Sequence, residues 1–287
     1  MRHGGRGGRP GSWSLLAAAL LATTACARHA SPLRVGSTTS LYDSGLLDAL
    51  VPAFESAHPD QDVKIIAVGT GEALALGRRR DVDVLLVHAP SAEATFMDGG
   101  YGHDRVTFMR NDFVIAGPLS DPAGISDSRS VAEALTAIAR KGAPFVSRGD
   151  GSGTHIKETA LWKVAHITPS GPWYREVGQG MGAALRIASE SGAYVLTDRA
   201  TLLALGESLR LSVLFGADST LANPYSVIQV TDAANPGGAC AFESWLLSDD
   251  AGRLIGAFGK DRFGSGLFRF LPSAAESPSC ASGESVR

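Results

Sequence analysis

Small polar residues, glycines and one arginine gather in three short segments of this chain. The segments are residues 37–40 (STTS), 69–71 (GTG) and 147–154 (SRGDGSGT). Hydroxyl groups donate hydrogen bonds without bulk, glycines let the backbone close on a small ligand, and arginine can grip two oxygens at once. This combination suits a small anion. The candidate ligand-binding residues are Thr39, Ser40, Thr70, Gly71, Ser147, Arg148, Ser152, Gly153 and Thr154.

Each segment also has a purely structural interpretation. A Ser or Thr before a helix often caps it, and Gly-Thr-Gly is a common turn. In the third segment, Arg148 and Asp150 could brace the turn while Thr154 caps the next helix. Both interpretations hold together if Asp150 orients Arg148 while the hydrogen-bond donors face a ligand. We therefore predict that Asp150 faces Arg148 and not the ligand.

Enzyme motifs fit these residues poorly. Asp150, not Gly, stands two places before Ser152, so the Gly-x-Ser-x-Gly elbow is missing, and no Gly-x-x-x-x-Gly-Lys-Ser/Thr loop occurs. His155 could act as a base, but a helix-surface or partly packed position is the simpler interpretation, and for Asp198 we expect a local ion pair or a helix cap. The seven histidines are scattered and no Cys-x-x-Cys occurs. We expect no catalytic residue, no cofactor and no metal ion.

The apolar pattern places the three segments between strands and helices. A first series alternates strands at residues 33–36, 63–68 and 82–87 with helices from Ser44 to Pro59 and at 72–79. A second series has strands at residues 111–118, 143–147, 193–196 and 225–230 and helices at 131–141, 155–164, 181–191, 201–209 and 241–258. Such alternation predicts mostly parallel sheets flanked by helices, with ligands beyond the carboxyl ends of the strands. Helix N-termini at those loops attract anions.

Two such sets predict an α/β protein of two lobes joined by two crossover strands. Lobe 1 is expected to be discontinuous and to comprise residues 33–117 and 223–272. Lobe 2 comprises residues 118–222, and residues 273–287 form a flexible Ser/Ala/Gly/Glu-rich tail.

The first 25 residues predict a signal peptide. Arg2, Arg6 and Arg9 precede an apolar stretch at 15–22 that is too short to span a bilayer. A small residue before Cys26 favours a lipoprotein signal with lipidation of Cys26, and ordinary cleavage after Ala25 or Ala27 is the alternative. Residues 26–32 would then be a tether, and the body is exported to the periplasm or another extracytoplasmic space.

Composition and charge narrow the class of partner. The chain has 34 glycines among 287 residues, yet no Gly-X-Y repeat. Removing residues 1–25 removes three arginines and no acidic residue, so the net charge of −3 becomes −6. A nucleic-acid partner is not expected. In an exported body Cys240 and Cys280 can form a disulfide, although a buried Cys240 with a free Cys280 is an equal alternative.

The motifs resemble those of the tungstate-binding proteins of bacterial ABC importers. SRGDGSGTH at 147–155 is similar to their Ser-Arg-Gly-Asp-x-Ser-Gly-Thr-His segment, and STTS at 37–40 resembles their Thr-Thr-Thr-Ser loop. Further matches are DVLLVHAP (83–90), NDFVIAGP (111–118), GQGMG (178–182), AYVLTDR (193–199) and GKDRF (259–263). The likeness covers about residues 33–268 in order. One departure is Ala200, where the family commonly has Gly.

The resemblance implies a type II periplasmic binding protein that closes on one tetrahedral oxyanion and delivers it to an ABC permease, acting as a monomer. The wider group includes molybdate, sulfate and phosphate binders, so the ligand could be tungstate or one of these. A periplasmic enzyme acting on a phosphorylated substrate and an anion sensor are the alternatives from other classes.

The protonation state of these anions at neutral pH distinguishes phosphate from the other three. Tungstate, molybdate and sulfate are dianions without a proton at neutral pH and only accept hydrogen bonds, whereas phosphate often carries a proton and needs an acceptor. A carboxylate facing a dianion in a dry site would repel it. The three segments offer donors, with Asp150 as their only carboxylate, which favours an unprotonated dianion. The choice of tungstate over molybdate rests on the resemblance alone.

Overall fold

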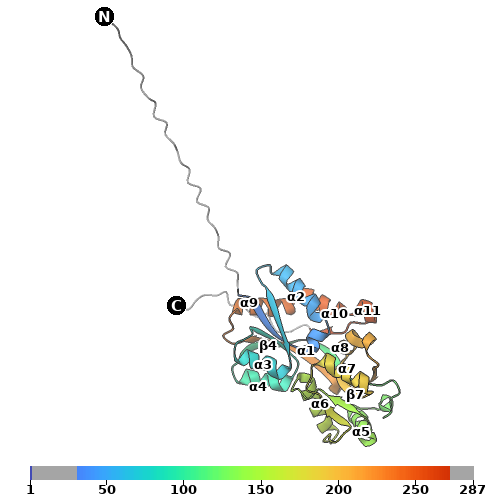
Figure 1. Ribbon diagram of the computed structural model, residues 1–287. Coiled ribbons are helices and arrows are strands. Elements are labelled where there is room, and N and C mark those ends of the chain that lie inside the picture. Colours follow the sequence, from blue (N-terminus) through green and yellow to red (C-terminus); the bar gives the residue numbers. More distant parts are fainter. Residues whose placement is uncertain (2–30, 272–287) are drawn as a thin grey trace.

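The computed structural model describes Met1 and residues 31–271, which form two lobes (Figure 1). The predicted signal peptide, Cys26, most of the tether, Cys280 and the predicted tail lie outside the described residues. None of the helices within residues 31–271 has the length and apolar character needed to cross a membrane.

Lobe 1 is built on a β-sheet in which three neighbouring strands run parallel. Its strands are β1 (Leu33–Thr38), β2 (Val63–Val68), β3 (Val84–Val87), β9 (Ala222–Val230), β10 (Arg269–Phe270) and the first part of β4 (Gly102–Gly117). Its helices are α1 (Thr39–Asp43), α2 (Leu46–Ala57), α3 (Thr70–Arg78), α4 (Pro90–Asp98), α9 (Pro236–Leu246), α10 (Asp249–Ala257) and α11 (Lys260–Phe263). Strand β1 pairs in parallel with β2 and β3, and β9 joins β3 antiparallel.

Lobe 2 repeats this plan. Its strands are β5 (Phe145–Ser147), β6 (Tyr174–Glu176), β7 (Tyr194–Asp198), β8 (Ser212–Phe215) and the end of β4. Its helices are α5 (Val131–Lys141), α6 (Gly153–Val164), α7 (Met181–Ser191) and α8 (Arg199–Leu205), with short 3₁₀ turns at η1 (Ile125–Asp127), η2 (Gly206–Ser208) and η3 (Ser219–Leu221). Strand β5 pairs in parallel with β6 and β7, which confirms the predicted parallel core of each lobe.

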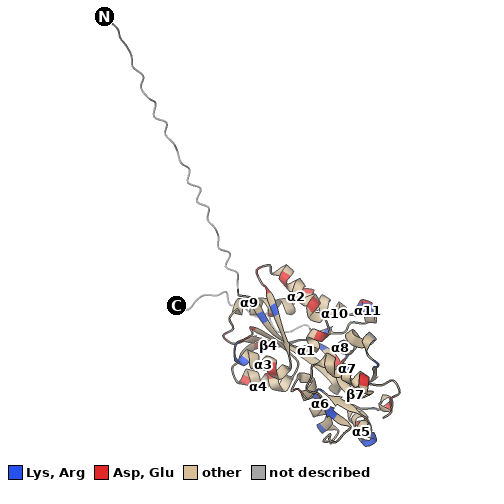
Figure 2. Ribbon diagram, in the orientation of Figure 1, with Lys and Arg blue, Asp and Glu red and all other residues tan. Residues whose placement is uncertain are grey.

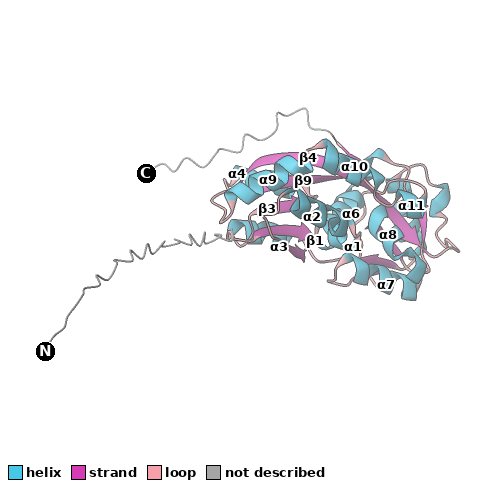
Figure 3. Ribbon diagram, turned by 90° about the horizontal axis from the view of Figure 1, so that it is seen from above, coloured by secondary structure: helices cyan, strands magenta, loops and turns pink. Residues whose placement is uncertain are grey.

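Both sheets are covered on both faces, because alternate strand residues point to opposite sides. In lobe 1 one face packs on α2, α9 and α10, and the other packs on α3 and α4. In lobe 2 one face packs on α5 and α6, and the other packs on α7. Seen from above, α3 and α4 lie at one end of the molecule and α7 and α8 at the other (Figure 3). Acidic and basic residues are interspersed over both lobes (Figure 2).

The lobes are joined through β4 and the segment that leads into β9. Residues of β4 up to Asp112 pair with β9 in the first sheet, whereas Phe113 to Gly117 pair with β7 and β8 in the second. The strand therefore changes sheet at Asp112 and Phe113, while the predicted boundary lay at residue 117, where the strand ends. A run of apolar residues predicts a strand, but it does not predict with which sheet that strand pairs.

Several helices differ from the sequence-based expectation at their ends. Residues 39–40 were expected in a loop, but Thr38 accepts a hydrogen bond from the Leu41 N–H group and α1 begins at Thr39. Similarly, α3 begins at Thr70 and α6 at Gly153, with Ser152 as the cap. The single helix predicted at 241–258 is two helices, because Ser248 caps a new helix at Asp249. Six candidate residues thus occupy first helical turns, namely Thr39, Ser40, Thr70, Gly71, Gly153 and Thr154, whereas Ser147 ends β5, Arg148 lies in the following loop and Ser152 is the cap of α6.

Candidate functional site

The first turns of five helices meet where the two lobes face each other. Thr39 of α1 contacts Arg148, and Thr70 of α3 contacts Gly153 of α6. Gly180, which precedes α7, lies next to Thr39, and the Thr201 hydroxyl of α8 donates to the Ser40 carbonyl at 2.9 Å. First turns carry unpaired N–H groups and a partial positive charge. This junction, called the interlobe site below, is therefore suited to a negative ligand.

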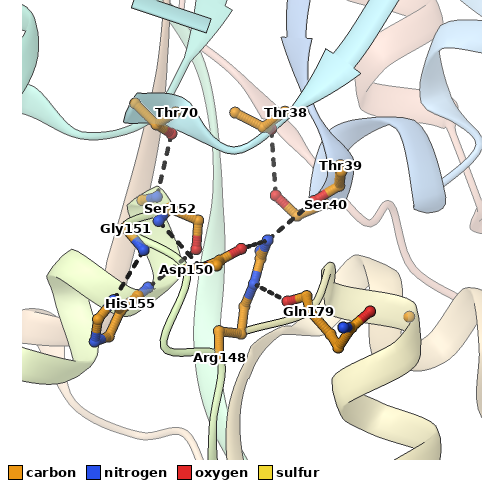
Figure 4. A network of polar contacts seen from close by, with 12 residues as sticks. Thr38, Thr39, Ser40, Thr70, Arg148, Asp150, Gly151, Ser152, His155 and Gln179 are labelled. Carbon is orange, nitrogen blue, oxygen red and sulfur yellow. Dashed lines mark hydrogen bonds and ion pairs between the residues drawn. The ribbon is translucent and has the colours of Figure 1, made fainter. Parts of the chain in front are cut away.

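Arg148 is the buried cation of the interlobe site, with 1% of the residue exposed. Its Nη2 atom donates to Asp150 Oδ2 at 2.5 Å and to Thr39 Oγ1 at 3.1 Å, and its Nε atom donates to the Gln179 carbonyl at 3.3 Å (Figure 4). The pairing with Asp150 was predicted and is confirmed. Nη1 is buried without a hydrogen-bond partner among residues 31–271. The guanidinium is thus fixed on one edge and available on the other.

The loop after Arg148 is braced by its own atoms. Asp150 Oδ1 accepts from the Ser152 N–H group at 3.1 Å, and Ser152 Oγ accepts from the His155 N–H group at 3.3 Å as the cap of α6. His155 Nδ1 accepts from the Gly151 N–H group at 3.0 Å, so this histidine braces the loop, as the packed interpretation predicted. Both Asp150 oxygens therefore accept a hydrogen bond from lobe 2 itself.

Two glycines are required by this geometry. Gly149 has a φ of +62°, and a Cβ atom there would lie 2.7 Å from Glu176 Cβ. At Gly153 a Cβ atom would lie 2.8 Å from the His88 ring. The missing side chain at Gly149 lets the loop pack against β6 of its own lobe, and the missing side chain at Gly153 lets α6 approach lobe 1.

The remaining candidate residues differ in whether their polar groups have a hydrogen-bond partner. The Gly153 N–H group donates to Thr70 Oγ1 at 3.2 Å, and Gly71 lies against the Gly151 carbonyl. The Thr154 hydroxyl is fully buried without a partner among the described residues. The Ser147 hydroxyl at the end of β5 is likewise buried without a hydrogen-bond partner among the described residues.

Ser40 lies behind Thr39, where it joins a buried chain of polar groups. Its hydroxyl is 3.2 Å from His88 Nε2, and His88 Nδ1 is 2.8 Å from Asn223 Oδ1. Since an amide oxygen only accepts, Nδ1 carries the proton. Burial lowers the pKa of His88 to about 4, so the ring is neutral at pH 7 and Nε2 accepts from Ser40. In this structure the Ser40 hydroxyl proton points towards His88.

The polar chain continues through the hinge strands to a buried carboxyl group. Asn223 Nδ2 donates to Asn111 Oδ1 at 2.7 Å, and Asn111 Nδ2 donates to Asp198 Oδ1 at 3.2 Å. Asp198 also accepts from the Thr201 N–H group and caps α8, which confirms the cap interpretation. Burial raises the pKa of Asp198, and the nearby Arg148 opposes the rise. A carboxyl group that ionises less readily repels a neighbouring anion less.

Sequence reasoning missed His88, Asn111 and Asn223. All three are almost fully buried. Asn111 and Asn223 lie on the connecting strands β4 and β9, and His88 directly follows β3, which pairs with β9. The signal that was present is a polar amide or imidazole at the edge of an apolar run, as in NDFVIAGP and DVLLVHAP. Such a residue inside a core needs a partner, and here the partners are one another.

Within residues 31–271 no group of three His, Cys, Asp or Glu side chains is placed to hold a metal ion. Cys240 is disulfide-bonded, and its predicted partner Cys280 lies outside the described residues. The geometry of the interlobe site is one of fixed donors, which suits binding of an oxyanion.

Comparisons with known proteins agree with this chemistry. A model of the PBP superfamily domain matches residues 24–250. The tungstate-binding protein TupA of Peptoclostridium acidaminophilum is 41% identical over 274 residues, which cover 89% of this chain and 95% of that protein. The structure of the tungstate ABC transporter from Geobacter sulfurreducens has a TM-score of 0.72 at 44% identity and covers 78% of this chain and 97% of its own. The tungstate-binding protein TupA from Desulfovibrio alaskensis G20 has a TM-score of 0.68 at 41% identity, covering 85% of this chain and 100% of its own.

Proposed function

This chain belongs to the PBP superfamily, and we propose that it captures tungstate outside the cytoplasm for import by an ABC transporter. The observation that carries the proposal is a pair of buried donors at the interlobe site, Arg148 Nη1 and Thr154 Oγ1, that have no partner among residues 31–271. Leaving a buried donor unpaired costs about 1–3 kcal/mol, and more for a charged group. A ligand that only accepts hydrogen bonds would remove this cost.

The donor set favours an oxyanion without a proton. Asp150 is held by Arg148 and by the Ser152 N–H group, which ties this carboxylate to its own loop. Hydrogen bonds to a charged group such as a dianion contribute roughly 1.5–3 kcal/mol each, and about six such bonds would support a nanomolar affinity, about −12 kcal/mol, after closure costs. Tungstate and molybdate share charge and shape. The preference for tungstate is therefore taken from the named relatives.

The lobes supply the means of capture. The Thr39–Arg148 and Thr70–Gly153 hydrogen bonds join opposite lobes, so they exist only while the lobes are together. Movement about the β4 and β9 connections would separate them and open the site. On capture, the Thr39 and Thr70 hydroxyls would rotate and donate to the oxyanion, and the Arg148 and Gly153 N–H groups that they release would donate to it as well. Closure then buries the ligand between donors from both lobes.

We further infer the setting in which the protein acts. The bound anion would pass to a membrane permease, and the protein would act as a monomer without catalysing a reaction. Lipidation of Cys26 would hold it at the membrane surface, and the Cys240–Cys280 disulfide would tie the tail to α9. These inferences rest on the sequence pattern and on the relatives named as tungstate-binding and ABC transporter proteins.

Titration calorimetry of residues 26–287 with tungstate, molybdate, sulfate and phosphate tests the function. We expect tight one-to-one binding of tungstate and of molybdate, weaker binding of sulfate, and weakest binding of phosphate. A tungstate isotherm without heat, confirmed by an unchanged melting temperature in excess tungstate, would overturn the proposal. Phosphate binding tighter than tungstate binding would do the same and would identify an acceptor in the site.

A further inference from the structure

Helix α7 begins without a side-chain cap of its own. Its cap position is Gly180, within the Gly178–Gly182 motif, and Gly180 makes no side-chain hydrogen bond. The first N–H groups of a helix need acceptors from outside the helix. Here the acceptor comes from the opposite lobe, because Asp43 Oδ2 of α1 accepts from the Gly182 N–H group at 3.1 Å. A helix of lobe 2 is thus capped by a carboxylate of lobe 1.

The two glycines of this motif allow the close approach. A Cβ atom at Gly180 would lie 3.6 Å from Thr39 Oγ1, and one at Gly182 would lie 3.3 Å from Asp43 Oδ2. The residue between the motif's first two glycines, Gln179, offers its carbonyl to Arg148 Nε. Residues 178–182 therefore contact α1 of lobe 1 and also hold Arg148 of lobe 2 through a backbone hydrogen bond.

We propose that Asp43 is a closure latch, a positioning residue whose carboxylate caps α7 only when the lobes are together and so stabilises the closed, anion-holding conformation. The inference rests on the proposed function. It gives the Gly178–Gly182 motif a role as the receiving surface of the latch, separate from the donors that contact the ligand. Asp43 itself does not touch the anion.

The latch fits the electrostatics of the site. A carboxylate at a helix N-terminus is favourable, because it meets the partial positive charge there and satisfies an N–H group. In the open form Asp43 is instead hydrated and α7 loses its cap. The Asp43–Gly182 hydrogen bond is therefore present only in the closed conformation, and an interaction made in one conformation alone shifts the equilibrium towards it.

The test compares D43A with S130A. Ser130 caps α5 within lobe 2 by accepting from the Glu133 N–H group, so its loss removes a cap without affecting the lobe contact. We expect D43A to weaken tungstate binding about fivefold, mainly through faster dissociation, and S130A to leave binding unchanged while lowering the melting temperature. D43N, which keeps an amide oxygen as acceptor, should lie between wild type and D43A.

Amide exchange in the unliganded protein gives a second measurement that does not need a ligand. The Gly182 amide should exchange faster in D43A than in wild type, because in wild type Asp43 protects this amide in the fraction of unliganded molecules that is closed, and S130A should leave the exchange unchanged. If wild type binds tungstate but D43A matches it in affinity, dissociation rate and Gly182 exchange, the latch is overturned. If wild type binds no anion, the proposed function fails, and the Gly182 exchange rate alone decides the latch.

Discussion

The two lobes contribute opposite kinds of groups to their contact. Lobe 2 supplies donors, namely the Arg148 guanidinium and the Gly153 and Gly182 N–H groups. Lobe 1 supplies the acceptors of these hydrogen bonds, which are the hydroxyls of Thr39 and Thr70 and the carboxylate of Asp43. A hydroxyl group can rotate to become a donor, but a guanidinium or an N–H group cannot become an acceptor. The comparison indicates that lobe 2 determines the charge of the ligand and that lobe 1 adapts and closes.

The lobes also differ in how firmly their groups are held. Arg148 is held by Asp150 and by the Gln179 carbonyl within lobe 2, and the loop after it is braced by His155. Among the described residues, the hydrogen-bond partner of the Thr70 hydroxyl is the Gly153 N–H group across the junction, and no residue of lobe 1 braces this hydroxyl in a comparable way. Preorganised donors lose little freedom when a ligand arrives. Substitutions in lobe 2 should therefore affect affinity more than matched ones in lobe 1.

The largest effect is expected for R148A. Removing the buried cation should weaken tungstate binding about a hundredfold, because a charge-assisted donor pair to a dianion is lost. R148K should recover part of the affinity, since it keeps the charge but loses the planar fork. R175A is the matched control, because Arg175 of β6 is an exposed cation in the same lobe. Calorimetry in which R148A and R175A bind alike would remove Arg148 from the site.

A smaller effect is expected from two buried carboxyl groups, one in each lobe. Burial raises the pKa of Glu158 in lobe 2 and of Glu243 in lobe 1 to about 7, from an ordinary 4.5. Between these values the folded protein keeps protons that the unfolded chain releases. The free energy of unfolding should therefore fall as pH rises from 4.5 to 7, by up to about 3 kcal/mol per group. Denaturant titrations of E158Q and E243Q should each show a flatter pH dependence than wild type.

The same pair separates the roles of the lobes. Glu158 lies one helical turn after Thr154 on α6, where it accepts from Tyr174 and Trp162. Its ionisation places a negative charge near the interlobe site, so tungstate affinity should fall about threefold between pH 6 and 8 in wild type and in E243Q, but not in E158Q. An equal pH dependence of affinity in both variants would show that the two lobes do not differ in this respect.

Local patterns in the sequence predicted the fold closely where caps and periodicity agree. The helices expected at residues 131–141 and 181–191 are observed with those bounds, and each ends at a glycine with a positive φ. The helix predicted across residues 241–258 was wrong, because apolar spacing continues through Leu247 while Ser248 starts a new helix. Periodicity shows which residues face the core but not whether the helix axis breaks between them.

The site was predictable only to the extent that its contacts are local. The Arg148–Asp150 pair lies within two residues, and its chemistry could be read from the loop. The Asn111–Asp198 hydrogen bond joins residues 87 apart, and the Asp43–Gly182 hydrogen bond joins residues 139 apart. Such pairs depend on how the lobes are connected and closed, which no local motif encodes. The starts of α1 at Thr39 and of α3 at Thr70 were missed for a related reason. Their cap residues, Thr38 and Gly69, are of types that also occur in loops, so the sequence alone does not show where the helix begins.

The smallest expected effect gives the finest comparison of the lobes. T154V and T70V each replace one buried hydroxyl by a methyl group of similar shape, in lobe 2 and lobe 1 respectively. Thr154 Oγ1 has no partner among the described residues, so T154V should weaken tungstate binding about tenfold while leaving the unliganded protein as stable or more stable. Thr70 Oγ1 already accepts from Gly153, so it exchanges one hydrogen bond for another on binding, and T70V should cost only about threefold in affinity and lower the unliganded stability. Calorimetry together with thermal unfolding separates the two results. The opposite order of affinities would mean that lobe 1 holds the anion and lobe 2 closes over it.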